Sequence, residues 1–279
     1  MYLFFDNGGT KTRVAYSHDG ESFNDPIIFP TEQRLDLQLK KLKTVATELS
    51  NGNLLRAVVG GIAGPLNKDK TCLMNSPHLS SWVGLPIKNE LENIFGCQVF
   101  LENDSALVGL GEAVRGAGRG DRIVAYITIS TGVGGVRIVD KKIDNNSFGF
   151  EPGYQIINFD ITDGANSRTN GHLEEYVSGR AIEKEYGKKP NEIKDKDIWT
   201  KKAEFLAVGL NNIIVLWSPD IIVLGGSMMK EVGISVLQVE KYLQKIMKIF
   251  PSIPKIKKAE LGDIGGLYGA LAYAKDKLD

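Results

Sequence analysis

Two threonines and a lysine surround a pair of glycines in the segment Asp6-Asn7-Gly8-Gly9-Thr10-Lys11-Thr12. Adjacent glycines let backbone N–H groups approach an anion, and the hydroxyls of Thr10 and Thr12 and the charge of Lys11 add to the attraction. The segment lacks the glycine spacing of a Walker loop, and a strand follows it where a Rossmann fingerprint has a helix. We expect a polyphosphate-binding hairpin, although an ordinary Asn-Gly turn explains the same residues.

A second glycine turn, Ser130-Thr131-Gly132-Val133-Gly134-Gly135, again joins two apolar strands. The two segments align at one common offset, as a duplicated strand-turn-strand core would give, but two glycine hairpins also occur by coincidence. Arg137 stands where a third Rossmann glycine would be, so another hairpin cradle is predicted. Thr131, Gly132 and Gly134 would neutralise a nucleotide phosphate from the other side of a cleft as its charge shifts in phosphoryl transfer.

An amide and a carboxylate, Asn103 and Asp104, stand between an apolar strand, Gln98–Leu101, and a helix that is predicted to run to about Val114. A carboxylate at the carboxyl end of a strand can take the proton of an attacking hydroxyl, which is the role of the base in phosphoryl transfer. Either residue can instead cap the helix. Both interpretations remain open from these residues alone.

Further along, Glu151 and Glu174 stand beside glycines. A carboxylate can accept hydrogen bonds from two neighbouring hydroxyls, which suits a polyol, but a solvated turn and a helix start explain these residues too. The apolar strand Ile221–Leu224 ends in Gly225 and Gly226, where a flat adenine ring could lie against the backbone. An ordinary exit from a buried strand is the alternative.

The pattern of apolar residues predicts an α/β protein whose strands alternate with helices. Helices are expected over residues 35–49, over the segment from Pro86 to Gly96, and over 264–278. Glycines near 115–121 mark a boundary, so we predict one domain over 1–116, joined by the C-terminal helix 264–279, and a second over 117–263. The predicted strands are Leu3–Asp6, Arg13–Ser17, Leu55–Gly60, Gln98–Leu101, Ile123–Ile129, Gly135–Asp140, Ile221–Leu224 and Lys255–Ala259.

Charge and composition limit the classes of partner. The 279 residues include 34 basic and 34 acidic ones, so no net charge attracts the chain to nucleic acid or to an anionic membrane. No basic leader and no run of about 20 apolar residues is present, which predicts a cytoplasmic protein with small-molecule partners. Cys72 and Cys97 are too far apart for a CxxC motif and are expected to be buried free thiols.

Taken in order, these segments resemble the ROK family of bacterial sugar kinases and regulators, within the actin, hexokinase and Hsp70-like superfamily. The resemblance covers nearly the whole chain. It implies a two-domain, actin-like (ribonuclease H-like) ATPase fold with mixed sheets and an interdomain cleft. By this resemblance the segment from Asp6 to Thr12 binds ATP phosphates, with Asp6 acting on Mg²⁺ through water, residues 130–135 form the second phosphate loop, and Gly225–Ser227 lies near adenosine.

The resemblance also assigns the sugar site. Asp104 falls on the family's catalytic base and Asn103 on a sugar ligand. Glu151 and Glu174 match residues that bind sugar hydroxyls, and the spacing Glu-x-x-x-Ser-Gly identifies Glu174. Tyr154 stands at a histidine position that touches the sugar in the family, so it is included among the expected substrate-binding residues.

Two departures from the family pattern concern the same pocket. The segment from Ser76 to Trp82 stands for Pro-Asn-Leu-Pro-Gly-Trp, which lines the sugar site, with His78 in place of Asn. Ser76 is expected to contact the sugar, and this wall is expected to differ from that of a glucokinase. Many members hold zinc with one histidine and three cysteines; here Tyr154 and His172 occupy two of those positions, so no zinc is predicted.

The expected function is that of an ATP-dependent sugar kinase, glucokinase-like at first guess, that phosphorylates a hexose or an N-acetylhexosamine with Mg²⁺. A catalytically silent sugar or nucleotide sensor is the main alternative, because the segment from Ser76 to Trp82 has diverged. Polyphosphate as the donor also fits. A repressor needs a helix-turn-helix before the first loop, and only five residues precede Asp6. A homodimer is possible, as in relatives.

Overall fold

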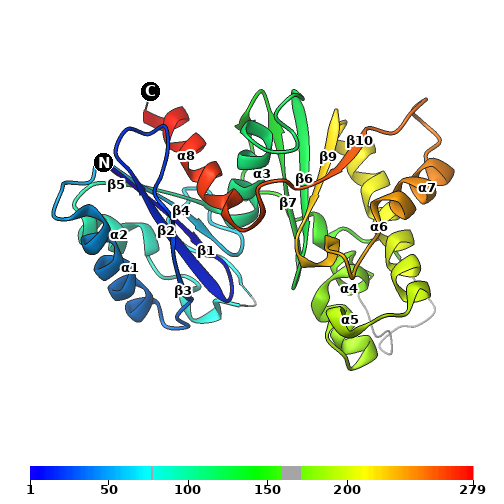
Figure 1. Ribbon diagram of the computed structural model, residues 1–279, viewed down its shortest axis with the longest axis horizontal. Coiled ribbons are helices and arrows are strands. Elements are labelled where there is room, and N and C mark those ends of the chain that lie inside the picture. Colours follow the sequence, from blue (N-terminus) through cyan, green and yellow to red (C-terminus); the bar gives the residue numbers. More distant parts are fainter. Residues whose placement is uncertain (77, 159–170, 279) are drawn as a thin grey trace. The chain divides into compact units, whose positions relative to one another are not determined.

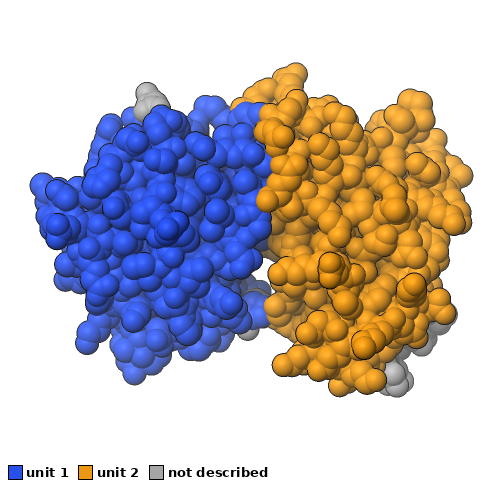
Figure 2. Space-filling view, viewed as in Figure 1, with its two compact units in different colours: residues 1–116, 141–149, 261–279 blue, residues 117–140, 150–260 orange. Residues whose placement is uncertain are grey.

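The computed structural model describes residues 1–76, 78–158 and 171–278 and has a mixed α/β architecture with two sheets (Figure 1). The chain divides into two compact units, which Figure 2 colours separately. Unit 1 comprises residues 1–116, 141–149 and 261–279, and unit 2 comprises 117–140 and 150–260. Unit 1 therefore includes residues 141–149 and 261–263, which the sequence predicts to belong to the second domain.

The sheet of unit 1 has the strand order β3-β2-β1-β4-β5. Strand β1 is antiparallel to β2 and parallel to β4, which is parallel to β5. In this register Asn7, Ile62 and Asn103 stand in one row, so the carboxyl ends of the three parallel strands meet at one edge. The strands are β1 (Tyr2–Asn7), β2 (Lys11–Ser17), β3 (Ile27–Pro30), β4 (Ala57–Ile62) and β5 (Gln98–Asn103).

Helices cover both faces of this sheet (Figure 1). Side chains alternate along a strand, so Leu3 and Phe5 join the core beneath α1 (Leu35–Ser50) and α2 (Ile87–Phe95). On the other face α3 (Asp104–Val114) and α8 (Gly265–Leu278) pack closely together. Two short 3-10 helices, Ser80–Trp82 and Gly262–Ile264, and the two-residue strand β8 (Lys142–Ile143) complete the unit.

The close packing of α3 on α8 depends on Gly269. A Cβ atom built there would overlap the carbonyl oxygen of Leu107 in α3. We expect Gly269→Ala to destabilise the protein by about 2 kcal/mol or more, because backbone overlap outweighs the gain of about 1 kcal/mol that alanine brings to a helix. Urea unfolding measures this, with Gly120→Ala as the control, since a Cβ at Gly120 meets no heavy atom within 4 Å. Unchanged stability of Gly269→Ala would contradict the packing.

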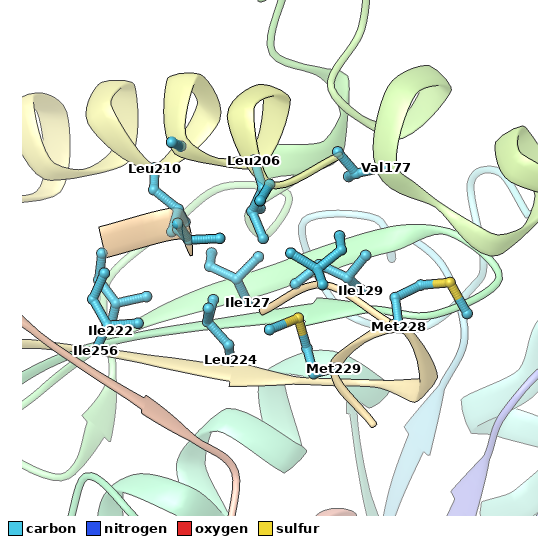
Figure 3. Close-up of a cluster of buried hydrophobic side chains, with 14 of the residues drawn as sticks. Ile127, Ile129, Val177, Leu206, Leu210, Ile222, Leu224, Met228, Met229 and Ile256 are labelled. Carbon is cyan, nitrogen blue, oxygen red and sulfur yellow. The ribbon is translucent and has the colours of Figure 1, made fainter. Parts of the chain in front are cut away.

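Unit 2 contains four strands in the order β10-β9-β6-β7. Strands β6 and β7 form an antiparallel hairpin, and β9 runs parallel to β6 and to β10. Figure 3 shows Ile127 and Leu224 of the sheet packed against Leu206 and Leu210 of α6, with Met229 beside them. The elements are β6 (Ile123–Ile129), β7 (Val133–Val139), α4 (Glu174–Val177), α5 (Gly179–Tyr186), α6 (Lys196–Trp217), β9 (Ile221–Gly225), α7 (Val236–Ile246), β10 (Lys255–Lys258) and 3-10 helices at Pro152–Tyr154, Pro190–Glu192 and Ser227–Met229.

The eight predicted strands and four predicted helices are all present, with ends shifted by a few residues. Helix α6 begins at Lys196, where the Asp195 side chain accepts a hydrogen bond from the N–H of Asp197, at 2.9 Å. Cys72 and Cys97 are free thiols but only partly buried, so the prediction of buried thiols is wrong in part. Among the described residues no helix is long and apolar enough to span a membrane.

Candidate active site

The first predicted phosphate loop is the turn between β1 and β2. The N–H of Gly8 donates to the carbonyl oxygen of Lys11 at 3.0 Å and closes the hairpin. Thr10 and Lys11 are exposed at the tip, as residues that meet a nucleotide must be. Thr12 is 0% exposed, and its hydroxyl donates to Asn7 Oδ1 at 2.7 Å. The prediction that Thr12 donates directly to phosphate is therefore wrong, because its side chain points into the core beneath the loop.

The segment around His78 lies against this loop. A Cβ atom on Gly9 would stand 2.7 Å from Cγ of His78, so only glycine leaves room for the imidazole. Ser76, predicted to contact sugar, is buried; its hydroxyl donates to the carbonyl oxygen of Ala63 at 2.9 Å and accepts from the N–H of Leu79 at 3.1 Å. Ser76 thus shapes the turn that presents His78, which corrects its predicted role as a sugar ligand.

The sequence left two roles open for Asn103 and Asp104, that of a helix cap and that of a base. In the structure Asn103 is the cap. The Asn103 side chain caps α3, accepting from the N–H of Ala106 at 3.1 Å and donating to the carbonyl oxygen of Gly64 at 3.0 Å. Asp104, the first residue of α3, is therefore not needed as the cap. Its Oδ1 accepts from the N–H of Ser105 at 2.7 Å, which leaves its other oxygen for a substrate hydroxyl.

Electrostatics connect Asp104 with Asp6 at the edge where β1 and β5 end. Burial raises the pKa of the Asp6 carboxyl to about 7, helped by the charge of Asp104 and opposed by that of Arg13. Burial also raises the pKa of Asp104, against the hydrogen bonds from Ser105. An Arg13 nitrogen lies 3.4 Å from Asp6 Oδ2. One buried carboxylate and one partly buried carboxylate in one place, only partly neutralised by arginine, favour a cation.

These oxygens suit magnesium. Mg²⁺ takes one or two carboxylates and fills its remaining positions with water and substrate phosphates. Among the residues that the structure describes, no group of three or more His, Cys, Asp or Glu side chains could hold a metal. Asp6 fits the predicted role of a water-mediated ligand, shared with a nucleotide. Tyr154 and His172, which stand at two zinc-ligand positions of the family, lie with ring centroids 5.4 Å apart.

The second predicted phosphate loop, between β6 and β7, lies directly beside Glu174. The N–H of Val133 donates to Glu174 Oε2 at 2.8 Å. A Cβ atom on Gly132 would stand 2.5 Å from the same oxygen, so this loop needs glycine to admit the carboxylate. The loop and Glu174 lie far apart in the sequence, and nothing in their spacing indicates this contact. The carboxylate predicted to bind sugar and the loop predicted to bind phosphate are thus joined by one hydrogen bond.

Tyr154 belongs to the same group of side chains. It is 49% exposed, and burial, together with the charges of Glu174 and Glu151, raises the pKa of its phenol. The phenol is therefore a neutral hydrogen-bond donor near two acceptor carboxylates. This combination can bind a polyol from several sides. The sugar-binding roles of Glu151, Tyr154 and Glu174 stay predictions.

A cavity of about 1100 Å³ opens beside the second loop, entirely within unit 2. Thr131 and Ser227 line this cavity. Gly225 and Gly226, which precede Ser227, do not line it. Gly226 has φ +91°, and a Cβ there would overlap the carbonyl oxygen of Ile129, so this glycine lets β9 turn closely past β6. Residues that the sequence analysis missed complete the lining, including Arg180, Glu183, Lys189, Met228, Lys230 and Lys258.

Sequence and structure comparisons agree with one another. The model described as ROK family matches residues 2–277. A putative fructokinase of Bacillus subtilis is 28% identical, with 87% of this chain and 82% of that protein covered. A ROK hexokinase of Thermus thermophilus has a similar structure, with TM-score 0.83, 24% identity and 99% of both chains covered. A ROK glucokinase of Streptomyces griseus, solved with glucose and AMPPNP, gives TM-score 0.77 and 23% identity over 99% of both chains.

Proposed function

Since this chain belongs to the ROK family of the actin-like fold, we propose that it is an ATP-dependent sugar kinase that acts on a hexose or an N-acetylhexosamine. The proposal rests first on Asp104. Its carboxylate stands at the carboxyl end of β5, beside Asp6, and Asn103 takes over the capping of α3. A carboxylate without a structural duty at the end of a parallel strand is a suitable base for a hydroxyl.

In the proposed reaction Asp104 accepts the proton of the sugar hydroxyl as its oxygen forms a bond to the γ-phosphorus. The bond from that phosphorus to the bridging oxygen breaks, and ADP leaves with its electron pair. Asp104 then returns the proton to water. The raised pKa of Asp104 brings its basicity closer to neutral pH, which favours general-base catalysis. The charge of Lys11 would offset that of the phosphates.

Each unit would hold one part of the substrates. Loop N–H groups and Asp6 of unit 1 would meet the phosphates, where bound magnesium supplies neutralising charge. In unit 2, Glu151, Glu174 and Tyr154 would bind sugar hydroxyls, and the 1100 Å³ cavity would take the nucleoside. We also propose that the protein acts in the cytoplasm without zinc, on free sugar and nucleotide.

A coupled assay of ADP release tests the function. We expect turnover with ATP, magnesium and one member of a panel that contains glucose, fructose, mannose, allose, N-acetylglucosamine and N-acetylmannosamine. The same assay with polyphosphate in place of ATP identifies the donor. If no sugar is phosphorylated although one of them raises the melting temperature, the protein is a sensor, a result that the divergent segment around His78 would then explain.

A further inference from the structure

A buried polar cluster, defined here as Asn7, Thr12, Thr31 and Gln38, lies beneath the first phosphate loop. Its members come from the end of β1, the start of β2, the segment after β3 and the helix α1. None of the four is more than 8% exposed, and Gln38 is 0% exposed. Polar side chains are buried in this way only when their hydrogen bonds are made inside the protein. The burial of these four side chains therefore depends on the hydrogen bonds that they make with one another and with nearby backbone groups.

Gln38 is the member that satisfies the others. Its Nε2 donates to Asn7 Oδ1 and to Thr12 Oγ1, both at 2.9 Å. Its Oε1 accepts from the N–H of Glu32 at 2.9 Å. The two N–H bonds tie α1 to both strands that carry the loop, and the acceptor bond ties it to the segment before the helix. A helix side chain thereby controls the base of the β1–β2 turn.

Thr31 contacts this network and holds the loop itself. Its hydroxyl lies 3.0 Å from that of Thr12 and donates to the carbonyl oxygen of Gly8 at 2.9 Å. Its N–H donates to the carbonyl oxygen of Thr10 at 3.1 Å. Two carbonyl groups of the loop are therefore held toward the interior.

The peptide bond between Gly8 and Gly9 fixes the direction of the Gly9 N–H. The described chain has no cis peptide bond, and in a trans peptide the C=O and the following N–H point in opposite directions. Because the carbonyl of Gly8 is held inward by Thr31, the N–H of Gly9 must point outward. Among the described residues this N–H has no acceptor. It is directed away from the core and toward whatever the loop binds.

We propose that Gln38 is a positioning residue for the nucleotide: its hydrogen bonds to Asn7 and Thr12 fix the two ends of the loop against Thr31, which keeps the carbonyl of Gly8 inward and so the N–H of Gly9 outward, toward a phosphate oxygen. This inference rests on the proposed kinase function, since it assigns a nucleotide phosphate to that N–H. Gln38 itself touches no substrate. Its loss should therefore weaken nucleotide binding and leave sugar binding unchanged.

Gln38→Met tests the inference, because methionine keeps the length and volume of glutamine and removes its hydrogen bonds. We expect the KM for ATP to rise about tenfold, the size of one lost hydrogen-bonding arrangement, with sugar affinity unchanged. Val45→Ala is the matched control, since Val45 is an apolar residue buried in the same helix α1, about two turns beyond Gln38. It should lower stability and leave the KM for ATP as it is. Equal effects of the two variants on KM would overturn the inference.

Hydrogen exchange of the loop, together with calorimetric binding of ATP, gives a test that does not need activity. Exchange of the peptide over residues 6–12 should be faster in Gln38→Met than in the wild type and unchanged in Val45→Ala. If Gln38→Met does not fold, Thr31→Val removes the hydroxyl bond to Gly8 with the same expected result. Absence of sugar turnover in the wild type would refute the kinase function alone. Unchanged loop exchange and ATP affinity in the variant would refute the role of Gln38.

Discussion

Asp104→Asn is expected to lower sugar-dependent turnover at least about a hundredfold, because a general base typically contributes ~10²–10⁴-fold. Asparagine has nearly the same shape and can still accept the hydrogen bond from the N–H of Ser105, so sugar affinity should stay within about twofold. Steady-state kinetics and calorimetric sugar binding measure the two quantities. Asp263→Asn is the control, since this exposed carboxylate also lies near Asp6 through Arg13. Near-normal turnover of Asp104→Asn would end the assignment of the base.

The same substitution should increase stability at neutral pH. The pKa of Asp104 is raised in the folded protein, so the folded state binds the proton more tightly than the unfolded state does. Stability is therefore lost as pH rises from the unfolded pKa of about 3.9 through the folded pKa, and asparagine avoids this loss. The melting temperature of Asp104→Asn should exceed that of the wild type at pH 7.5, and the two should converge toward pH 4. A lower melting temperature at pH 7.5 would contradict the burial of the carboxylate.

The elements of this fold could be predicted because their signals are local. Apolar runs end at glycine turns, and the register then brings Asn7 and Asn103 to one edge of the sheet, as the parallel strands require. The direction in which an individual side chain points is harder to predict. The glycine-loop pattern predicts that Thr12 donates to phosphate, yet in β2 it alternates with the exposed Lys11 and so faces the core. Alternation applied from Lys11 onward would have identified it.

The contacts of Gln38 and Glu174 could not be predicted in the same way, because both reach another element far along the chain. One signal for Gln38 does exist. It shares the apolar face of α1 with Leu35 and Leu42, and a polar residue at a buried helix position needs an internal partner. No such signal accompanies Glu174, whose carboxylate meets the second loop only after α4 and the β6–β7 hairpin have packed. Tertiary packing therefore determines that Gly132 has no room for a side chain, because Glu174 occupies that space.

Gly132→Ala should impair the binding of both substrates, because the new methyl group would stand 2.5 Å from Glu174 Oε2. Either the carboxylate leaves the N–H of Val133 or the loop shifts, and a displacement of about 1 Å in such a site can lower kcat/KM by as much as ~10²-fold. We expect kcat/KM to fall at least about tenfold for sugar and for ATP alike. Initial-rate measurements with each substrate varied in turn provide the test.

Glu174→Gln separates the two effects. Its side-chain oxygen can still accept from the N–H of Val133, so the loop keeps its shape while the charge that favours sugar hydroxyls is removed. This variant should raise the KM for sugar and leave the KM for ATP near its normal value. If Gly132→Ala also affects sugar alone, the loop does not bind nucleotide, and the hydrogen bond from Val133 serves only to orient Glu174. If both constants rise in Gly132→Ala and one rises in Glu174→Gln, the carboxylate and the phosphate loop work as a single positioned unit.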